Sequence, residues 1–123
     1  MDAEEAKAIV ARYFQRLLNE QDLRVCHELL AADYVDHDAP SDTPPGPAST
    51  EAYMRGFFAR HAELSFTIEH IIAEGDSVAL RGVWRGVDHQ LGSYEQTGIV
   101  LLRLNQHGQL RERWSGYLPR RGL

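Results

Sequence analysis

The spacing of apolar residues changes near the middle of this chain, and the change constrains its fold more than any other feature. Up to His61, apolar side chains recur every three or four positions, which is typical of helices that bury one face. From Leu64 onward they alternate with polar side chains, which is typical of strands in a sheet with one buried face. Helices followed by strands predict an α+β domain with an antiparallel sheet.

The first half of the chain predicts three helices. The first covers 6–18, and a shorter second helix begins after Asp22, whose carboxylate can cap it. An extended segment over 33–38 and a proline-rich loop over 39–48 follow, and Ser49 is the expected N-cap of the third helix. The three apolar stripes are Ala6, Ile9, Val10, Tyr13, Phe14, Leu17 and Leu18; Leu23, Cys26, Leu29 and Leu30; and Tyr53, Met54, Phe57, Phe58 and His61.

The second half predicts an antiparallel sheet of four or more strands. A sheet that wraps helices gathered on one face must curve, and five glycines in or next to the strands offer places where it can bend. We therefore expect one domain over 1–123, an α+β cone barrel with a pocket at its open end. The expected strands are 64–72, 78–85, 94–104 and 110–117, and the glycines are Gly82, Gly86, Gly92, Gly98 and Gly116.

Charge and cysteine content exclude several function classes. The 123 residues include 13 Lys and Arg against 18 Asp and Glu, so the net charge of −5 disfavours nucleic acid and anionic membranes as partners. Cys26 is the only cysteine, which excludes an internal disulfide. The N-terminus is acidic and no apolar run approaches the ~20 residues of a membrane span, so we expect a cytoplasmic protein. Six histidines are the one unusual count, and they direct the search for chemistry.

Five strings carry a resemblance that runs through nearly the whole chain. They are YFQRLLN at 13–19, DL at 22–23, ADYVDHD at 32–38, QTG at 96–98 and HGQLRERW at 107–114. Together they resemble the SnoaL-like polyketide cyclase branch of the nuclear transport factor 2-like superfamily, which has a cystatin-like α+β cone. The resemblance implies a homodimer through the outer sheet face and a pocket for a small, apolar, oxygenated molecule, with no cofactor.

The same resemblance implies three functions that the sequence leaves open. Cyclases and isomerases of this kind move protons on ketones with an acid/base group in a dry pocket. A ligand-binding or dimeric interaction module is the second possibility, favoured because no carboxylate follows Glu112, where related cyclases carry an acid/base Asp on the last strand. Hydrolysis of an epoxide is the third, and it needs two carboxylates beside an arginine.

His37 is the main catalytic candidate. It ends the first short strand, where related isomerases place their base, and imidazole exchanges protons near neutral pH. Tyr13 or His89 would polarise the ligand carbonyl, although each also has a structural reading, Tyr13 in the core and His89 in an exposed turn. Strand alternation turns Asp36 and Asp38 away from the face of His37, so we interpret both as solvated or capping residues.

The remaining candidates line the pocket or the outer face of the sheet. Glu112 shares a strand face with Trp114, and the sequence does not decide whether that face is concave or outer. No spacing of histidines and carboxylates on one element suggests a metal site. The other histidines are assigned to surfaces, helix ends and turns. The expected ligand contacts are Tyr34, Tyr53, Phe57, Trp84, Glu112 and Trp114, and the expected outer-face cations are Arg81, Arg85, Arg103, Arg111 and Arg113.

Overall fold

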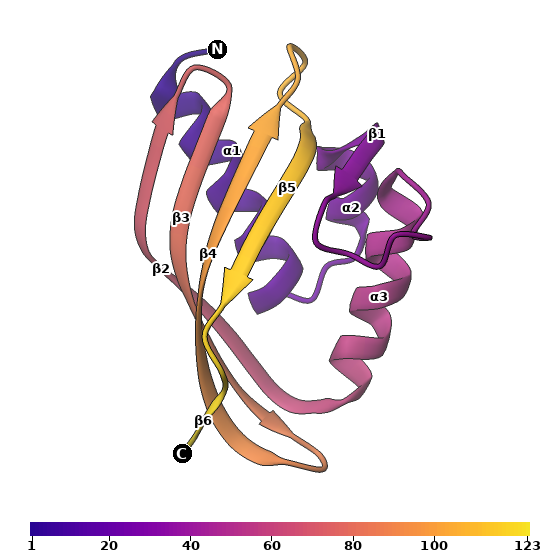
Figure 1. Ribbon diagram of the computed structural model, residues 1–123, viewed down its shortest axis with the longest axis vertical. Helices are drawn as coiled ribbons and strands as arrows, with labels where there is room; N and C mark the ends of the chain where they lie inside the picture. The colour runs from indigo at the N-terminus through magenta and orange to yellow at the C-terminus, as the bar shows by residue number, and fades with distance from the viewer.

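Three helices pack against the concave face of one curved sheet in the computed structural model, which describes residues 1–123 (Figure 1). A π-helical turn, Gln15–Asn19, extends the first helix. The helices are α1 (Ala3–Phe14), α2 (Arg24–Leu29) and α3 (Pro47–Ala59). The strands are β1 (Leu30–Asp36), β2 (His61–Glu74), β3 (Ser77–Asp88), β4 (Gly92–Leu104), β5 (Leu110–Tyr117) and β6 (Arg121–Gly122).

The strand order is β1-β5-β4-β3-β2, and the short β6 pairs with β4. All pairings are antiparallel except that of β1 with β5, which is parallel. The prediction of an α+β fold with three helices on a strongly curved sheet is therefore confirmed, and the sheet remains open. The sequence pattern did not predict β6 or the parallel pairing, because neither depends on periodicity.

The helices pack on the sheet through the predicted apolar stripes. Val10, Tyr13 and Phe14 of α1 are at most 1% exposed, and Phe14 stacks against Phe66 of β2 at 5.1 Å between ring centroids. The Ser49 cap was wrong: the N-cap of α3 is Gly46, three residues earlier, because Pro47 fits the first helical position. The Ser49 hydroxyl instead donates to the Pro44 carbonyl at 2.8 Å.

A β-bulge at Arg111 determines which side chains of β5 face the helices. Arg103 of β4 pairs with Glu112, whereas the next residue of β4 pairs with Leu110, so Arg111 is the extra residue. Leu110 is fully buried on the concave face, and the bulge turns Glu112 to the outer face and Arg113 to the concave face. This answers the open question about Glu112 and corrects the prediction that Arg113 lies outside.

The outer sheet face carries cross-strand ion pairs, as expected for three of the arginines. Their partners are Glu69 for Arg81 at 2.9 Å, Glu95 for Arg85 at 2.8 Å and Glu112 for Arg103 at 3.4 Å. Exposed pairs of this kind contribute little stability each. Pairing of two copies through this face stays a prediction, as does a cytoplasmic location. None of the helices has the length and apolarity needed to cross a membrane.

Candidate functional site

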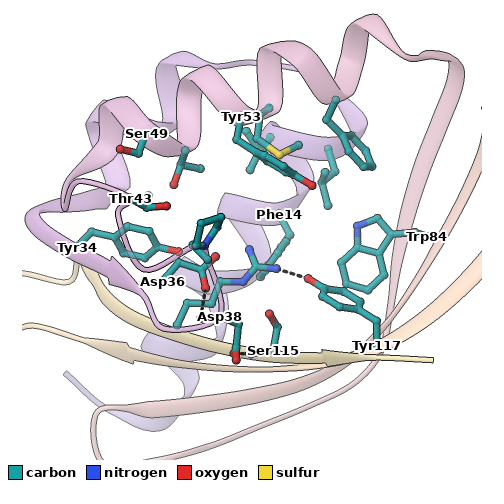
Figure 2. A pocket seen from close by; sticks show the side chains of 18 of the residues that line it. Phe14, Tyr34, Asp36, Asp38, Thr43, Ser49, Tyr53, Trp84, Ser115 and Tyr117 are labelled. Atoms are coloured by element: carbon teal, nitrogen blue, oxygen red, sulfur yellow. Dashed lines mark hydrogen bonds between the residues drawn. The ribbon is translucent and has the colours of Figure 1, made fainter. Parts of the chain in front are cut away.

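A cavity of about 700 Å³ lies between α3 and the concave face of the sheet (Figure 2). Its volume is in the range of small-molecule pockets. Helix α3 closes one side with Tyr53, and Trp84 of β3 forms part of the opposite wall. The apolar lining consists mainly of Phe14, Leu17, Leu18, Met54, Phe57 and Trp84.

The polar groups of the cavity gather where β1 ends beside β5. Asp36 is the register partner of Arg113, and both side chains reach the cavity. Asp38 follows in the loop, and one of its oxygens accepts a hydrogen bond from the Ser115 backbone N–H at 2.6 Å. One oxygen of Asp36 accepts from the backbone N–H of Asp38 at 3.0 Å. Parallel pairing of β1 with β5 therefore brings two carboxylates and one guanidinium to the same wall.

Arg113 is a largely buried cation without an acidic partner. Its Nη2 donates to the Tyr117 hydroxyl at 2.7 Å, and its guanidinium carbon lies 5.6 Å from the Phe14 ring centroid. Its Nε is buried and has no hydrogen-bond partner. No carboxylate lies within 4.0 Å of the guanidinium nitrogens. Burial works against the charge of Arg113, but the neighbouring Tyr117, Tyr34 and Tyr13 hydroxyls and the Asp36 carboxylate keep its pKa above the usual value.

Two tyrosine hydroxyls stand beside this cation. Burial raises the pKa of Tyr34 to about 12, so its hydroxyl keeps its proton and remains a hydrogen-bond donor at neutral pH. The Tyr117 oxygen accepts from Arg113, which leaves its own proton available for a ligand. Figure 2 shows Asp36 and Asp38 on one side of the cavity and Tyr117, which accepts the hydrogen bond from Arg113, together with Trp84 on the other.

Comparison with known proteins identifies the family of this pocket. Residues 10–113 match the model of the SnoaL-like domain. The chain belongs to this family. No curated protein matches the sequence of this SnoaL-like domain.

Solved structures with the same fold share little of the sequence. TsrD from Streptomyces laurentii superposes with a TM-score of 0.82 at 18% identity, covering 95% of this chain and 90% of that one. A SnoaL-like polyketide cyclase from Agrobacterium tumefaciens gives 0.78 at 17% identity, with 96% and 93% covered. An LEH-like epoxide hydrolase of M. tuberculosis gives 0.76 at 17% identity, with 94% and 84% covered. At these identities the likeness establishes the fold and leaves the reaction open.

His37, the main catalytic candidate, does not line the pocket of this SnoaL-like domain. Its Nε2 lies 3.0 Å from Glu112 Oε2, and its ring stacks on Trp114 with 4.5 Å between centroids. All three side chains lie on the outer face. The bulge determines which side chains of β5 point outward, and the pairing of β1 with β5 determines the same for the end of β1. The expectation that His37, Glu112 and Trp114 contact the ligand is therefore not met.

Tyr13 and His89 are also separate from the cavity. Tyr13 is fully buried in the core, and its hydroxyl has no hydrogen-bond partner. His89 is exposed in the turn between β3 and β4, where its backbone N–H donates to the Arg60 carbonyl at 2.9 Å. The other expected contacts, Tyr34, Tyr53, Phe57 and Trp84, do line the cavity.

The sequence reasoning missed the charged wall. Asp36 and Asp38 were interpreted as solvated or capping residues, and Arg113 as an outer-face residue, because the sequence does not show which side chains of β1 and β5 face the helices. His61, expected on the inner face of the third helix, instead begins β2 and is only 7% exposed. Its Nε2 lies 2.7 Å from the Tyr94 hydroxyl. No group of three or more His, Cys, Asp or Glu side chains could hold a metal ion.

Gly98 of β4 makes room for Tyr117. A Cβ at this position would lie 2.6 Å from Tyr117 Cδ1 and 3.1 Å from Trp84 Cζ3. We expect Gly98→Ala to displace the Tyr117 ring, to change the near-ultraviolet circular dichroism of the tyrosine and tryptophan, and to lower the free energy of unfolding by ~1 kcal/mol. Gly116→Ala is the matched control, because a Cβ there meets nothing within 4 Å. Equal spectra for the two variants would show that Gly98 does not seat Tyr117.

Proposed function

We propose that this protein catalyses cofactor-free acid/base chemistry on a largely apolar ketone, as a polyketide cyclase or isomerase does. The observation that carries the proposal is the half-buried Asp36 carboxylate next to the Arg113 guanidinium, on one wall of a cavity with an apolar lining. A carboxylate can accept a proton there, and a cation with adjacent phenols can hold the negative charge that develops.

The proposed reaction begins when Asp36 removes a proton from the carbon next to the ketone. The electron pair of that C–H bond moves to the carbonyl oxygen and forms an enolate. The Tyr117 hydroxyl donates to this oxygen, and the Arg113 charge behind it stabilises the anion. An isomerase then returns the proton from Asp36 to a different carbon. A cyclase forms a C–C bond from the enolate to a second carbonyl of the same ligand, and the new alkoxide takes the proton back.

Asp36 is a better candidate for the base than Asp38. The Asp36 side chain is half-buried beside Arg113, whereas Asp38 is exposed and binds the Ser115 backbone. Asp36 is also the register partner of Arg113, so it lies on the wall beside the cation that would stabilise the developing charge. Each carboxylate has one oxygen in a backbone hydrogen bond, which fixes its orientation and leaves the other oxygen for chemistry.

The test is exchange of α-protons of 2-tetralone for deuterium in D₂O, followed by NMR. We expect the wild-type protein to accelerate the exchange above the buffer rate, and Asp36→Asn to reduce the acceleration by about 100-fold or more. Asp33→Asn is the matched control, because Asp33 lies on the same strand, is exposed and does not line the cavity. Exchange at the buffer rate with the wild-type protein would contradict the proposal.

Epoxide hydrolysis is the second candidate, and the presence of two carboxylates beside Arg113 in the cavity favours it. Asp36 would take a proton from water while the water oxygen attacks an epoxide carbon. Asp38, which is exposed, would relay a proton from solvent to the epoxide oxygen as the C–O bond breaks. Styrene oxide incubated with the protein would then yield the diol. Failure of both reactions would support the ligand-binding alternative.

A further inference from the structure

Arg113 differs from every other arginine of the chain in how its charge is balanced. Eight of the twelve arginines have an acidic side chain within 4.0 Å, namely Arg16, Arg24, Arg55, Arg81, Arg85, Arg103, Arg120 and Arg121. Three without such a partner, Arg12, Arg60 and Arg111, are exposed and are balanced by water. Arg113 alone lacks an acidic partner and is also withdrawn from solvent.

Desolvation works against a withdrawn cation, and Asp36, the acid that favours the charge of Arg113, acts from beyond 4.0 Å. The guanidinium of Arg113 has five N–H groups, and the structure assigns one of them to the Tyr117 hydroxyl. Arg113 lines the cavity, so donors on the guanidinium remain available to a ligand. A planar fork of this kind matches the two oxygens of a carboxylate.

We infer that the ligand of this cavity is a keto acid whose carboxylate binds Arg113 and whose ketone oxygen accepts a hydrogen bond from Tyr117. The inference rests on the proposed function for the position of the ketone, and it adds the anionic group. Both oxygen sites are adjacent, because the Arg113 Nη2 and the Tyr117 hydroxyl are 2.7 Å apart.

The distribution of charge in the cavity determines the direction from which a carboxylate approaches. Asp36 and Asp38 repel an anion on their side of the wall, so the ligand carboxylate lies on the Tyr117 side (Figure 2). Arg120 also lines the cavity, but Asp88 neutralises it at 3.2 Å and its guanidinium lies over the Tyr94 ring at 3.9 Å. The apolar lining then contacts the carbon skeleton of the ligand.

The test compares 2-naphthoate with 2-naphthamide, which has nearly the same shape and no charge. Titration calorimetry near pH 7 is expected to show naphthoate binding the wild-type protein at least ~10-fold more tightly than the amide, a difference of about 1.4 kcal/mol. Arg113→Met is expected to remove this preference and to change the affinity for the amide by less than about threefold. Arg120→Met is the matched control and should keep the preference, because Arg120 already has an acidic partner.

Two outcomes would overturn the inference. One is naphthoate binding no more tightly than the amide, and the other is an equal loss of preference in both arginine variants, which would indicate a general electrostatic effect. Arg113→Gln provides a second variant if the methionine variant fails to fold by circular dichroism. The readout is independent of the proposed reaction: 2-tetralone carries no carboxylate, so proton exchange can succeed when the acid preference fails, and the reverse also holds.

Discussion

Replacing Arg113 by methionine should raise the melting temperature by about 3–6 °C and reduce α-proton exchange by about 100-fold or more. The stability gain follows because methionine fills the site without the desolvation cost that burial imposes on the guanidinium. Methionine is unbranched and can keep the contact with Phe14 that the arginine stem and guanidinium make. The loss of activity follows because the enolate would lose the cation behind Tyr117.

Scanning calorimetry of the wild type and the variant measures the first effect. Arg103→Met is the matched control, because Arg103 lies on the outer face and pairs with Asp76 and Glu112 as an exposed side chain. Its substitution should change the free energy of unfolding by no more than about 1 kcal/mol. If Arg113→Met melted several degrees below the wild type, Arg113 would be a structural residue and the argument for an unbalanced cation would fail.

If Arg113 lowers stability in this way, the cavity that it faces is built for a ligand. Protein interiors normally pair or exclude charges, and exceptions concentrate at functional sites. The same wall holds Asp36 beside Arg113 without an ion pair, although their backbones are register partners. Asp36 favours the charge of Arg113 only from beyond 4.0 Å, so neither group is held in a direct ion pair and both remain available to a substrate.

Periodicity was sufficient to predict the helices and most of the strands. A segment that buries one face repeats apolar residues at the period of its secondary structure. The stripe that includes Val10 and Phe14 therefore indicated α1, and the alternation that includes Leu80 and Trp84 indicated β3. These patterns depend only on residues close together in sequence. The fold class followed from their order along the chain.

The candidate site could not be predicted in the same way, because it depends on strand phase, that is, on which alternate residues of a strand face the helices. Asp36 ends β1 and His37 follows it, so their side chains face opposite sides, and a shift of one residue exchanges their roles. The phase is set by β5, since the His37 backbone N–H donates to the Arg113 carbonyl at 2.8 Å. The phase of β5 in turn depends on the bulge at Arg111, which no local pattern indicated. The family resemblance pointed to the end of β1, and the structure places Asp36 rather than His37 in the cavity.

The buried tyrosines lead to the second large effect, a loss of stability at alkaline pH. Burial raises the pKa of Tyr34 to about 12, and it raises the pKa of Tyr13 and Tyr94 above the usual value. An unfolded tyrosine loses its proton near pH 10, whereas these side chains keep theirs in the folded protein. Above about pH 10 the unfolded state therefore binds fewer protons than the folded state. The sign of the linkage is that stability is complete below about pH 10 and falls as the pH rises toward the folded pKa values.

Each tyrosine that keeps its proton in the folded state but loses it in the unfolded state should lower the free energy of unfolding by about 1.36 kcal/mol per pH unit. Tyr13 and Tyr34 together then account for about 2.7 kcal/mol per pH unit. A domain with a total stability of about 5–15 kcal/mol would lose much of it by about pH 12. Urea unfolding at about pH 9, 10 and 11 measures how the free energy of unfolding changes with pH. Tyr34→Phe should reduce this slope by about 1.4 kcal/mol per pH unit, the contribution of one tyrosine. Tyr53→Phe, at the exposed rim of the cavity, is the matched control. A wild-type stability that stayed constant to about pH 11 would mean that Tyr13 and Tyr34 lose their protons as readily in the folded state as in the unfolded state, which would contradict their raised pKa values.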